Sequence, residues 1–238
     1  MNYLLLRGLA RNSKHWHGLD KGLSGEVILL DTIGNGTKSD LSSPLQISSH
    51  TEILRDEFYK LRKHQEDWTI VGLSLGGMIA LDWVSRFPND FKKSFIINSS
   101  TNDVLYPWQR FDLFTFLKLP FLIFSNRANQ EKTILSLTLN LKNVNSDLID
   151  SNLAIGEVTT RLNLIKQLIS AAFFHSPEKI DIPLYFICSE RDRLVNYKAS
   201  LNLAKKYNSK VFIHPTAGHD IPLDDPNWLL KTILENKE

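Results

Sequence analysis

The stretch TIVGLSLGGMIALDWVSRFP, from Thr69 to Pro88, is almost entirely apolar, yet it places Ser74 between Gly72 and Gly76. The residues before the serine are typical of a buried strand, and those after it follow a helical pattern. A serine on a sharp strand-to-helix turn is held in a strained backbone conformation with its hydroxyl above the sheet. Side chains at the flanking positions would clash with the neighbouring strand and helix, so glycines are needed there. The pattern predicts that Ser74 is a nucleophile.

The helix expected to begin at Leu75 would place its N-terminus next to Ser74. The first N–H groups of a helix have no partner within it, and the positive end of the helix dipole lies at the same place. These groups would stabilise an oxyanion formed at Ser74. The alternative interpretation is a tight turn that contains a serine by chance. A nucleophile also needs a base and an acid that orients the base, and the rest of the chain must supply them.

Strand-like and helix-like segments alternate along most of the chain. This alternation indicates right-handed crossovers and a mainly parallel sheet, which is an α/β fold. The clearest amphipathic helix is expected over Ser48–His64, where Ile53, Leu54, Phe58 and Leu61 would share one face. The expected strands are Tyr3–Leu6, Glu26–Asp31, Trp68–Leu73, Ser94–Ser99, Pro183–Ser189 and Lys210–Pro215.

Two residues near the C-terminus can serve the serine. Asp192 follows the expected strand Pro183–Ser189, and His219 follows the last expected strand. The carboxyl ends of parallel strands share one edge of a sheet, so these side chains and Ser74 can converge. Asp103, after the fourth strand, is a second candidate for the acid, but its surroundings favour a role in a turn. We therefore predict a Ser74–His219–Asp192 triad.

The order nucleophile, acid, histidine resembles the α/β-hydrolase fold family, and the resemblance runs from the first strand to the C-terminal helix. Members of this family often carry His-Gly after the strand that precedes the first helix, and a tryptophan nine residues after that histidine. Arg7, Gly8 and Trp16 stand at this spacing here. The segment DTIGNGTKS, Asp31–Ser39, resembles the family's D-x-P-G-x-G-x-S segment, with Ile33 in place of proline.

The resemblance implies the oxyanion hole. In the family, the residue after His-Gly and the residue after the nucleophile each donate a main-chain N–H, which implies Leu9 and Leu75 here. Arg7 replaces the usual histidine and is expected to put a cation near the oxyanion loop. Ser189 replaces a frequent glycine before the acid.

The chain begins at what would be the family's third strand. The strand Glu26–Asp31, which the family's first two strands normally cover, is therefore expected at the edge of the sheet. An uncovered apolar edge invites pairing or needs shielding. This predicts either a homodimer through Glu26–Asp31 or a local feature that protects the edge.

The alternation of strands and helices stops between about Thr101 and Lys179. We predict a core formed by residues 1–100 and 180–238 and a helical lid formed by residues 101–179, rich in aromatic side chains. A few extra helices packed on the core are the alternative interpretation. In a lid, Trp108, Phe111 and Phe114 are expected to bind substrate.

Composition excludes several classes of protein. The 28 basic and 26 acidic residues give a net charge of +2, which offers no case for nucleic acid binding. No apolar run reaches the length of a membrane span, and the N-terminus lacks the pattern of a signal peptide. The single cysteine, Cys188, excludes an internal disulfide and is expected to be buried and inert. We therefore predict a cytoplasmic location.

A short run near the N-terminus resembles part of a zinc motif through His15, His17 and Asp20. These residues cannot form a site by themselves, and no second cluster follows, so no metal site is predicted. The segment IGNGTKS, Ile33–Ser39, resembles a phosphate loop but lacks a glycine directly before Lys38 and the full spacing, and is interpreted as a turn.

The sequence thus predicts a serine hydrolase of the α/β-hydrolase type that needs no cofactor. Its expected substrate is a carboxylic ester or thioester with an apolar acyl group, either free or bound to a carrier. The same triad in this family also serves lyases, C–C bond hydrolases and aminopeptidases. A non-catalytic ligand-binding member of the fold is the competing class.

Overall fold

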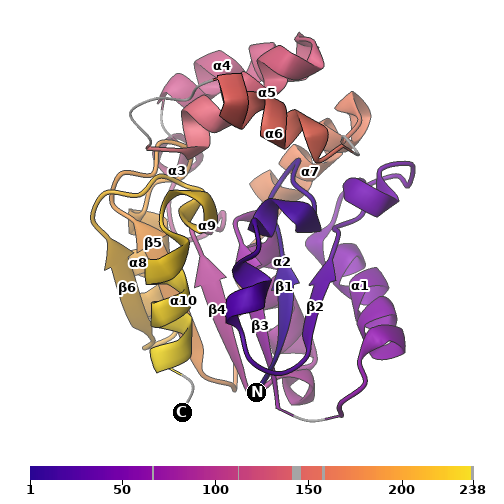
Figure 1. Ribbon diagram of the computed structural model, residues 1–238. Helices are drawn as coiled ribbons and strands as arrows, with labels where there is room; N and C mark the ends of the chain where they lie inside the picture. Colours follow the sequence, from indigo (N-terminus) through magenta and orange to yellow (C-terminus); the bar gives the residue numbers. More distant parts are fainter. Residues whose placement is uncertain (66, 112, 141–145, 157–158, 237–238) are drawn as a thin grey trace.

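The computed structural model describes residues 1–65, 67–111, 113–140, 146–156 and 159–236. Its centre is a six-stranded sheet in the order β2-β1-β3-β4-β5-β6, in which every pair of neighbours is parallel (Figure 1). The strands are β1 (Asn2–Leu6), β2 (Val27–Leu30), β3 (Trp68–Leu73), β4 (Lys93–Ile97), β5 (Leu184–Ser189) and β6 (Lys210–His214). All six lie within strands expected from the sequence or overlap them closely, and the predicted α/β-hydrolase architecture is confirmed.

The central strands are buried on both faces, which explains their almost continuous apolar sequences. In β1, Leu4 and Leu6 belong to one core cluster, whereas Tyr3 and Leu5 belong to the cluster on the opposite face. This alternation follows from the two-residue period of a strand. The sheet therefore separates two hydrophobic cores.

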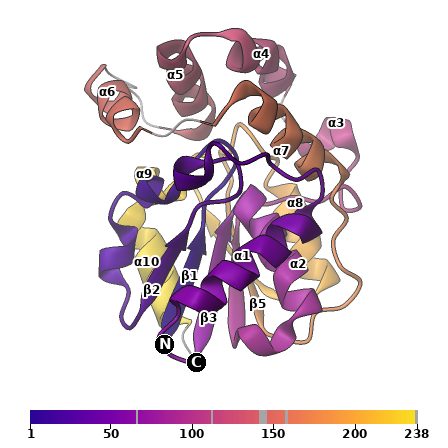
Figure 2. The same cartoon turned by 90° about the vertical axis from the view of Figure 1, so that its right-hand side faces the viewer.

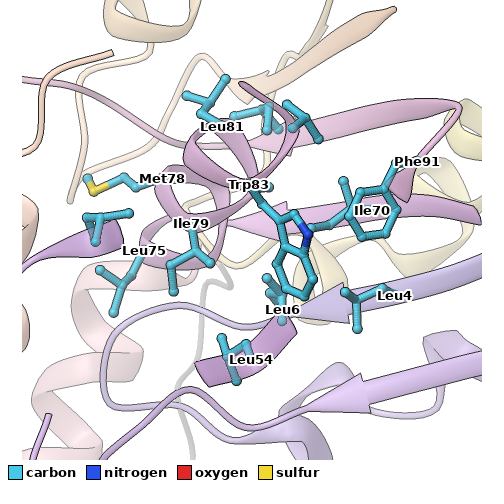
Figure 3. Close-up of a cluster of buried hydrophobic side chains, with 14 of the residues drawn as sticks. Leu4, Leu6, Leu54, Ile70, Leu75, Met78, Ile79, Leu81, Trp83 and Phe91 are labelled. Atoms are coloured by element: carbon cyan, nitrogen blue, oxygen red, sulfur yellow. The ribbon is translucent and has the colours of Figure 1, made fainter. Parts of the chain in front are cut away.

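Helices cover both faces of the sheet (Figures 1 and 2). On one face lie α1 (Ile47–Leu61), α2 (Leu75–Arg86) and α8 (Lys198–Lys206). On the other lie α9 (Ile221–Asp224) and α10 (Pro226–Glu235), together with the short helical turns η1 (Ser13–Trp16) and η2 (Leu19–Gly22). Figure 3 shows how side chains of β1, β3, α1 and α2 fill the first core.

The buried face of α1 differs from the expected one. Leu54 and Phe58 are fully buried, as expected, but Ile53 and Leu61 are exposed. The buried stripe also contains the polar residues Thr51 and His50, which a search for apolar residues cannot include. The buried face of α1 differs from the expected one because tertiary packing, and not hydrophobicity alone, sets the orientation of a helix.

Between β4 and β5, the described part of residues 101–179 forms helices, joined by loops, and one isolated β-bridge between Phe111 and Val195. We call these residues the helical insert. Its elements lie above the carboxyl ends of the strands (Figure 1). They are α3 (Pro107–Arg110), α4 (Leu113–Phe124), α5 (Arg127–Thr138), α6 (Ser146–Ala154) and α7 (Arg161–Phe173).

Buried hydrogen bonds fasten α7 to the core. The side chain of Gln167 is fully buried, donates to the carbonyl of Ile33 at 3.3 Å, and accepts the N–H of Ala10 at 3.3 Å. The Gln167 bonds position α7 over the loops that follow β1 and β2. Within the insert, the guanidinium of Arg110 in α3 donates to the carbonyls of Ala171 and Ala172 at the end of α7, each at 3.0 Å.

The strand β2 lies at one edge of the sheet, as predicted. It is only four residues long, shorter than the expected Glu26–Asp31. Short edge strands are one way in which proteins limit pairing with other chains. Among the described residues, no helix is long and apolar enough to span a bilayer.

Candidate active site

Ser74 lies at the junction of β3 and α2, where the sequence places it. Its backbone has φ 57° and ψ −114°, a conformation that is strained for a residue with a side chain. The surrounding structure holds this turn: the N–H of Ser74 donates to the carbonyl of Ile97 at 2.8 Å, and the hydroxyl of Ser99 donates to the carbonyl of Ser74 at 2.9 Å. The predicted strained turn is therefore present.

The flanking glycines allow two close backbone approaches. A Cβ added to Gly72 would lie 2.3 Å from the carbonyl oxygen of Gly76 in α2, and one added to Gly76 would lie 2.3 Å from the carbonyl oxygen of Leu6 in β1. Both distances are far shorter than any contact a real Cβ makes. The clash expected from the sequence thus involves the neighbouring helix for one glycine and the neighbouring strand for the other.

His219 and Asp192 form a buried pair. His219 Nδ1 lies 2.6 Å from Asp192 Oδ2, and their side chains are 4% and 1% exposed. The other carboxylate oxygen accepts the N–H groups of Leu194 at 2.8 Å and Val195 at 2.9 Å, so the carboxylate is fixed in place. An acceptor at Nδ1 selects the tautomer in which Nε2 is free to accept a proton.

Ser74 and His219 line the same cavity, at the carboxyl edge of the sheet and beneath the helical insert. The cavity has a volume of about 140 Å³. Apart from Arg7, Arg11, His219, Asp220 and a few hydroxyls, its wall is apolar. The apolar side chains of the insert that contribute to it are Phe111, Leu119, Leu122, Ile134, Leu137, Leu168 and Ala171.

The two predicted oxyanion donors belong to the wall of this cavity. Leu9 follows β1 and Leu75 is the first residue of α2, and both line the cavity beside Ser74. Within the part of the chain that the structure describes, their main-chain N–H groups donate to no protein acceptor. Two amides at such positions can stabilise negative charge that develops on a bound carbonyl oxygen.

The three residues proposed to bind substrate have different outcomes. Phe111 lines the cavity. Trp108 does not: it is 70% exposed and stacks on Tyr106 with the ring centroids 4.9 Å apart. The side chain of Phe114 lies outside the described residues. Phe111 is therefore the one of the two described side chains that lies where a ligand in the cavity would contact it.

The carboxylate of Asp103 contacts Ser176 and Lys206 and not His219. Its carboxylate accepts the N–H of Ser176 at 2.8 Å and the hydroxyl of Ser176 at 2.5 Å, and it pairs with Lys206 at 3.0 Å. Despite partial burial, these hydrogen bonds hold the pKa of Asp103 well below its usual range. Asp103 thus joins the start of the insert to its end and to α8.

Arg7 occupies the position expected from the sequence but is not a free cation. Its guanidinium forms two hydrogen bonds with the carboxylate of Asp220, at 2.7 and 3.1 Å, and both side chains are almost completely buried. The Arg7 charge lowers the pKa of Asp220 against the effect of burial. The pair therefore ties the loop after β1 to the residue that follows His219.

Sequence reasoning missed Asn98, at the end of β4. Its carboxamide accepts the N–H of Ser189 at 2.9 Å and donates to the carbonyl of His219 at 2.7 Å. The side chain is fully buried and joins the loops that carry the acid and the histidine. No motif singles out an asparagine at a strand end, so only the fold reveals this contact.

The remaining candidates have structural roles. Among the described residues, no group of histidine, cysteine and acidic side chains could hold a metal ion. Burial raises the pKa of the Cys188 thiol to about 12, which fits the inert role predicted for it. Asp31 accepts the N–H groups of Ser13 and Thr37, so the glycine-containing segment after β2 is a turn fastened to η1.

A six-stranded parallel sheet with a serine at a strained strand-to-helix turn and a buried His–Asp pair at the same edge defines the class of an α/β-hydrolase. The chain belongs to the alpha/beta hydrolase fold family, whose model matches residues 4–226. Family membership thus confirms the resemblance seen in the sequence.

Solved structures share this fold. A lipase-esterase related protein from Clostridium acetobutylicum superposes with a TM-score of 0.78 at 21% identity, over 98% of this chain and 93% of that one. An esterase from Exiguobacterium antarcticum superposes with a TM-score of 0.80 at 15% identity, over 100% and 91% of the two chains.

The similarity to a curated protein is more limited. An uncharacterized protein of Mycobacterium tuberculosis is 30% identical over 105 residues. The match covers 42% of this chain and 30% of that relative, so it spans less than a third of the relative's length.

Proposed function

We propose that this protein is a serine hydrolase that cleaves a carboxylic ester or thioester with an apolar acyl group. The observation that carries the proposal is the buried pair of His219 and Asp192, 2.6 Å apart, beside a cavity that Ser74 also lines. Nucleophile, base and orienting acid are the three parts that acyl transfer through a serine requires.

The reaction would proceed in two stages. His219 Nε2 takes the proton of the Ser74 hydroxyl as the serine oxygen attacks the substrate carbonyl, while Asp192 stabilises the imidazolium. The N–H groups of Leu9 and Leu75 hold the oxyanion. His219 then returns the proton to the leaving alcohol or thiol. Water, activated by the same imidazole, hydrolyses the acyl-enzyme and regenerates Ser74. Neither a metal nor a cofactor takes part in these steps.

The wall of the cavity supports an apolar acyl group. The insert contributes leucine, isoleucine and phenylalanine side chains around Ser74, and burial of apolar surface contributes about 25 cal/mol per Å² to binding in area bookkeeping. A short aliphatic or aromatic acyl chain suits a space of about 140 Å³. Screening acyl chain lengths, with free and carrier-bound esters compared, defines the substrate further.

A fluorophosphonate probe tests the nucleophile directly. We expect the folded protein to be labelled at Ser74 and to hydrolyse a p-nitrophenyl ester of a short fatty acid. Ser74→Ala should lose labelling and lower kcat by several orders of magnitude, the scale measured when a triad member is removed. Ser151→Ala, on the surface of α6, is the matched control and should behave as the parent does.

Two outcomes would contradict the proposal. Absence of labelling on a folded protein would favour a non-catalytic member of the fold that binds a ligand. Ser74→Ala activity within about tenfold of the parent would show that Ser74 is not the nucleophile. Labelling at Ser74 without hydrolysis of any ester would instead direct attention to the lyase, C–C hydrolase and aminopeptidase alternatives.

A further inference from the structure

A second cavity of about 50 Å³ adjoins the one that contains Ser74. The two cavities share four wall residues, Ala10, Arg11, Leu122 and Ile134. Its wall includes residues of the loop after β1 and of the insert helices α4, α5, α6 and α7. These helices lie above the sheet (Figure 2). The two cavities are therefore neighbours, with these side chains between them.

The second cavity has a different chemical character from the first. Its wall contains the guanidinium groups of Arg11, Arg127 and Arg161, and its only carboxylate among the described wall residues is Glu131. Arg11 and Glu131 form a buried ion pair at 2.7 Å, so the charge of this carboxylate is already compensated. Arg127 and Arg161 leave the wall with a net positive charge.

These two arginines retain free donors. Arg127 donates to the carbonyl of Leu153 at 2.6 Å, and Arg161 donates to the carbonyl of Phe124 at 3.5 Å. Each bond uses one N–H of the five that a guanidinium offers. Both side chains come from the first residue of a helix, α5 or α7, and both are exposed, so they can turn toward a ligand without unfolding the core.

Three polar atoms of the wall residues are buried. Arg11 Nε, Glu131 Oε1 and Asn152 Oδ1 are shielded from solvent and have no hydrogen-bond partner within the part of the chain that is described. Burial, together with the charge of Arg11, holds the pKa of His15 well below its usual range, so this imidazole adds no charge to the wall. Two of these atoms are oxygens that only accept hydrogen bonds, so an anion would be held by the guanidinium groups and not by these oxygens.

We infer that the second cavity binds an anionic oxygen group, a carboxylate or a phosphate, at the far end of an apolar chain held in the first cavity. Guanidinium groups bind both anions through paired hydrogen bonds, which explains the use of arginine at this place. This inference rests on the proposed function. If the protein is an esterase, its substrate is an ester whose apolar part ends in a negative charge.

Binding to the Ser74→Ala variant tests the site independently of catalysis. The ligands are pentyl phosphate, hexanoate and the neutral hexanol, with affinity measured by calorimetric titration. The anionic ligands should bind at least tenfold more tightly than hexanol. Arg127→Gln and Arg161→Gln should each weaken the binding of the preferred anion about tenfold, because a hydrogen bond to a charged group is lost. Lys132→Gln, an exposed cation of α5 outside the cavity, is the matched control.

The outcomes distinguish a phosphate from a carboxylate ligand, and they distinguish the anion site from the proposed esterase activity. Loss for pentyl phosphate alone identifies a phosphate, and loss for hexanoate alone identifies a carboxylate. Equal affinity of all three ligands, or anion binding that neither arginine substitution changes, would overturn the inference. These results do not depend on turnover. If the fluorophosphonate probe failed to label the protein, the proposed esterase activity would be contradicted, but anion binding in the second cavity could still be measured.

Discussion

At the scale of single residues, hydrogen-bond partners distinguish two aspartates that the sequence leaves similar. Both follow strands and both lie near the carboxyl edge of the sheet. Asp192 is bonded to His219, whereas Asp103 is bonded to Ser176 and Lys206. Only the first can select the tautomer of the imidazole and stabilise its charged form.

The amide variants of these aspartates test the assignment. Asp192→Asn should lower kcat about 10⁴-fold with the fold intact, because the amide favours the wrong tautomer of His219. Asp103→Asn should lower kcat by less than about tenfold, since it weakens only the contact between the insert and α8. Steady-state kinetics of both variants at one pH, with circular dichroism as the control for folding, decides between them. A crippled Asp103→Asn with an active Asp192→Asn would show that the acid is misassigned.

At the scale of elements, the junction of β3, α2 and β1 fixes the position of the nucleophile. The helix can approach the sheet closely only because Gly72 and Gly76 have no side chains. Close approach in turn sets the strained backbone of Ser74 and directs the start of α2 toward the cavity. Packing between elements and the chemistry of one hydroxyl are thus coupled.

A glycine substitution should show this coupling. Gly76→Ala places a methyl group against the Leu6 carbonyl, where the backbone on both sides must move, and we expect a loss of stability of about 3 kcal/mol or more. Gly18→Ala is the control: its φ of 82° is strained for alanine, but the nearest atom lies 3.9 Å away, so it should cost only about 1 kcal/mol. Urea denaturation measures both values. Equal losses would indicate that the close approach contributes nothing beyond backbone conformation.

At the scale of the whole molecule, buried ionisable groups control the response to acid. His50 of α1 is completely buried, and this burial lowers the pKa of its imidazole to about 4. An unfolded histidine titrates near pH 6.5. Below that pH the unfolded chain binds a proton that the folded chain does not, so acid favours unfolding until the folded state also becomes protonated near pH 4.

The pH dependence of stability follows from this difference. Between pH 6.5 and 4.5, His50 should reduce the free energy of unfolding by about 2 kcal/mol. In His50→Leu, the free energy of unfolding should fall less between the two pH values, because the contribution of this imidazole is gone. His64→Leu, at an exposed histidine, should retain the full pH dependence of the parent. Urea unfolding at the two pH values provides the measurement. The same pH dependence in His50→Leu and the parent would refute the assignment.

The edge strand raises the question of assembly. A homodimer through β2 remains a prediction, and the short length of the strand supports the alternative of a protected edge. Light scattering distinguishes them: pairing of two β2 strands should give twice the 27.3 kDa of one chain. A single-chain mass at every concentration tested would eliminate the dimer.

The sequence by itself determined the parts that depend on local patterns. Continuous apolar runs predicted strands that are buried on both faces, and the alternation of strands with helices predicted a parallel sheet. The glycines around Ser74 predicted the strained turn, because only a close backbone approach requires residues without side chains there. The sheet edge on which Asp192 and His219 meet followed from topology alone.

Contacts between segments distant in the chain were decided only by the tertiary structure. Asn98 bridges the ends of β4, β5 and the histidine loop, and Arg7 pairs with Asp220 more than two hundred residues away. Aromatic composition could not predict that Phe111 faces the cavity while Trp108 faces solvent. Side-chain type specifies what a residue can bind, but the packing of the insert on the core decides which group it meets.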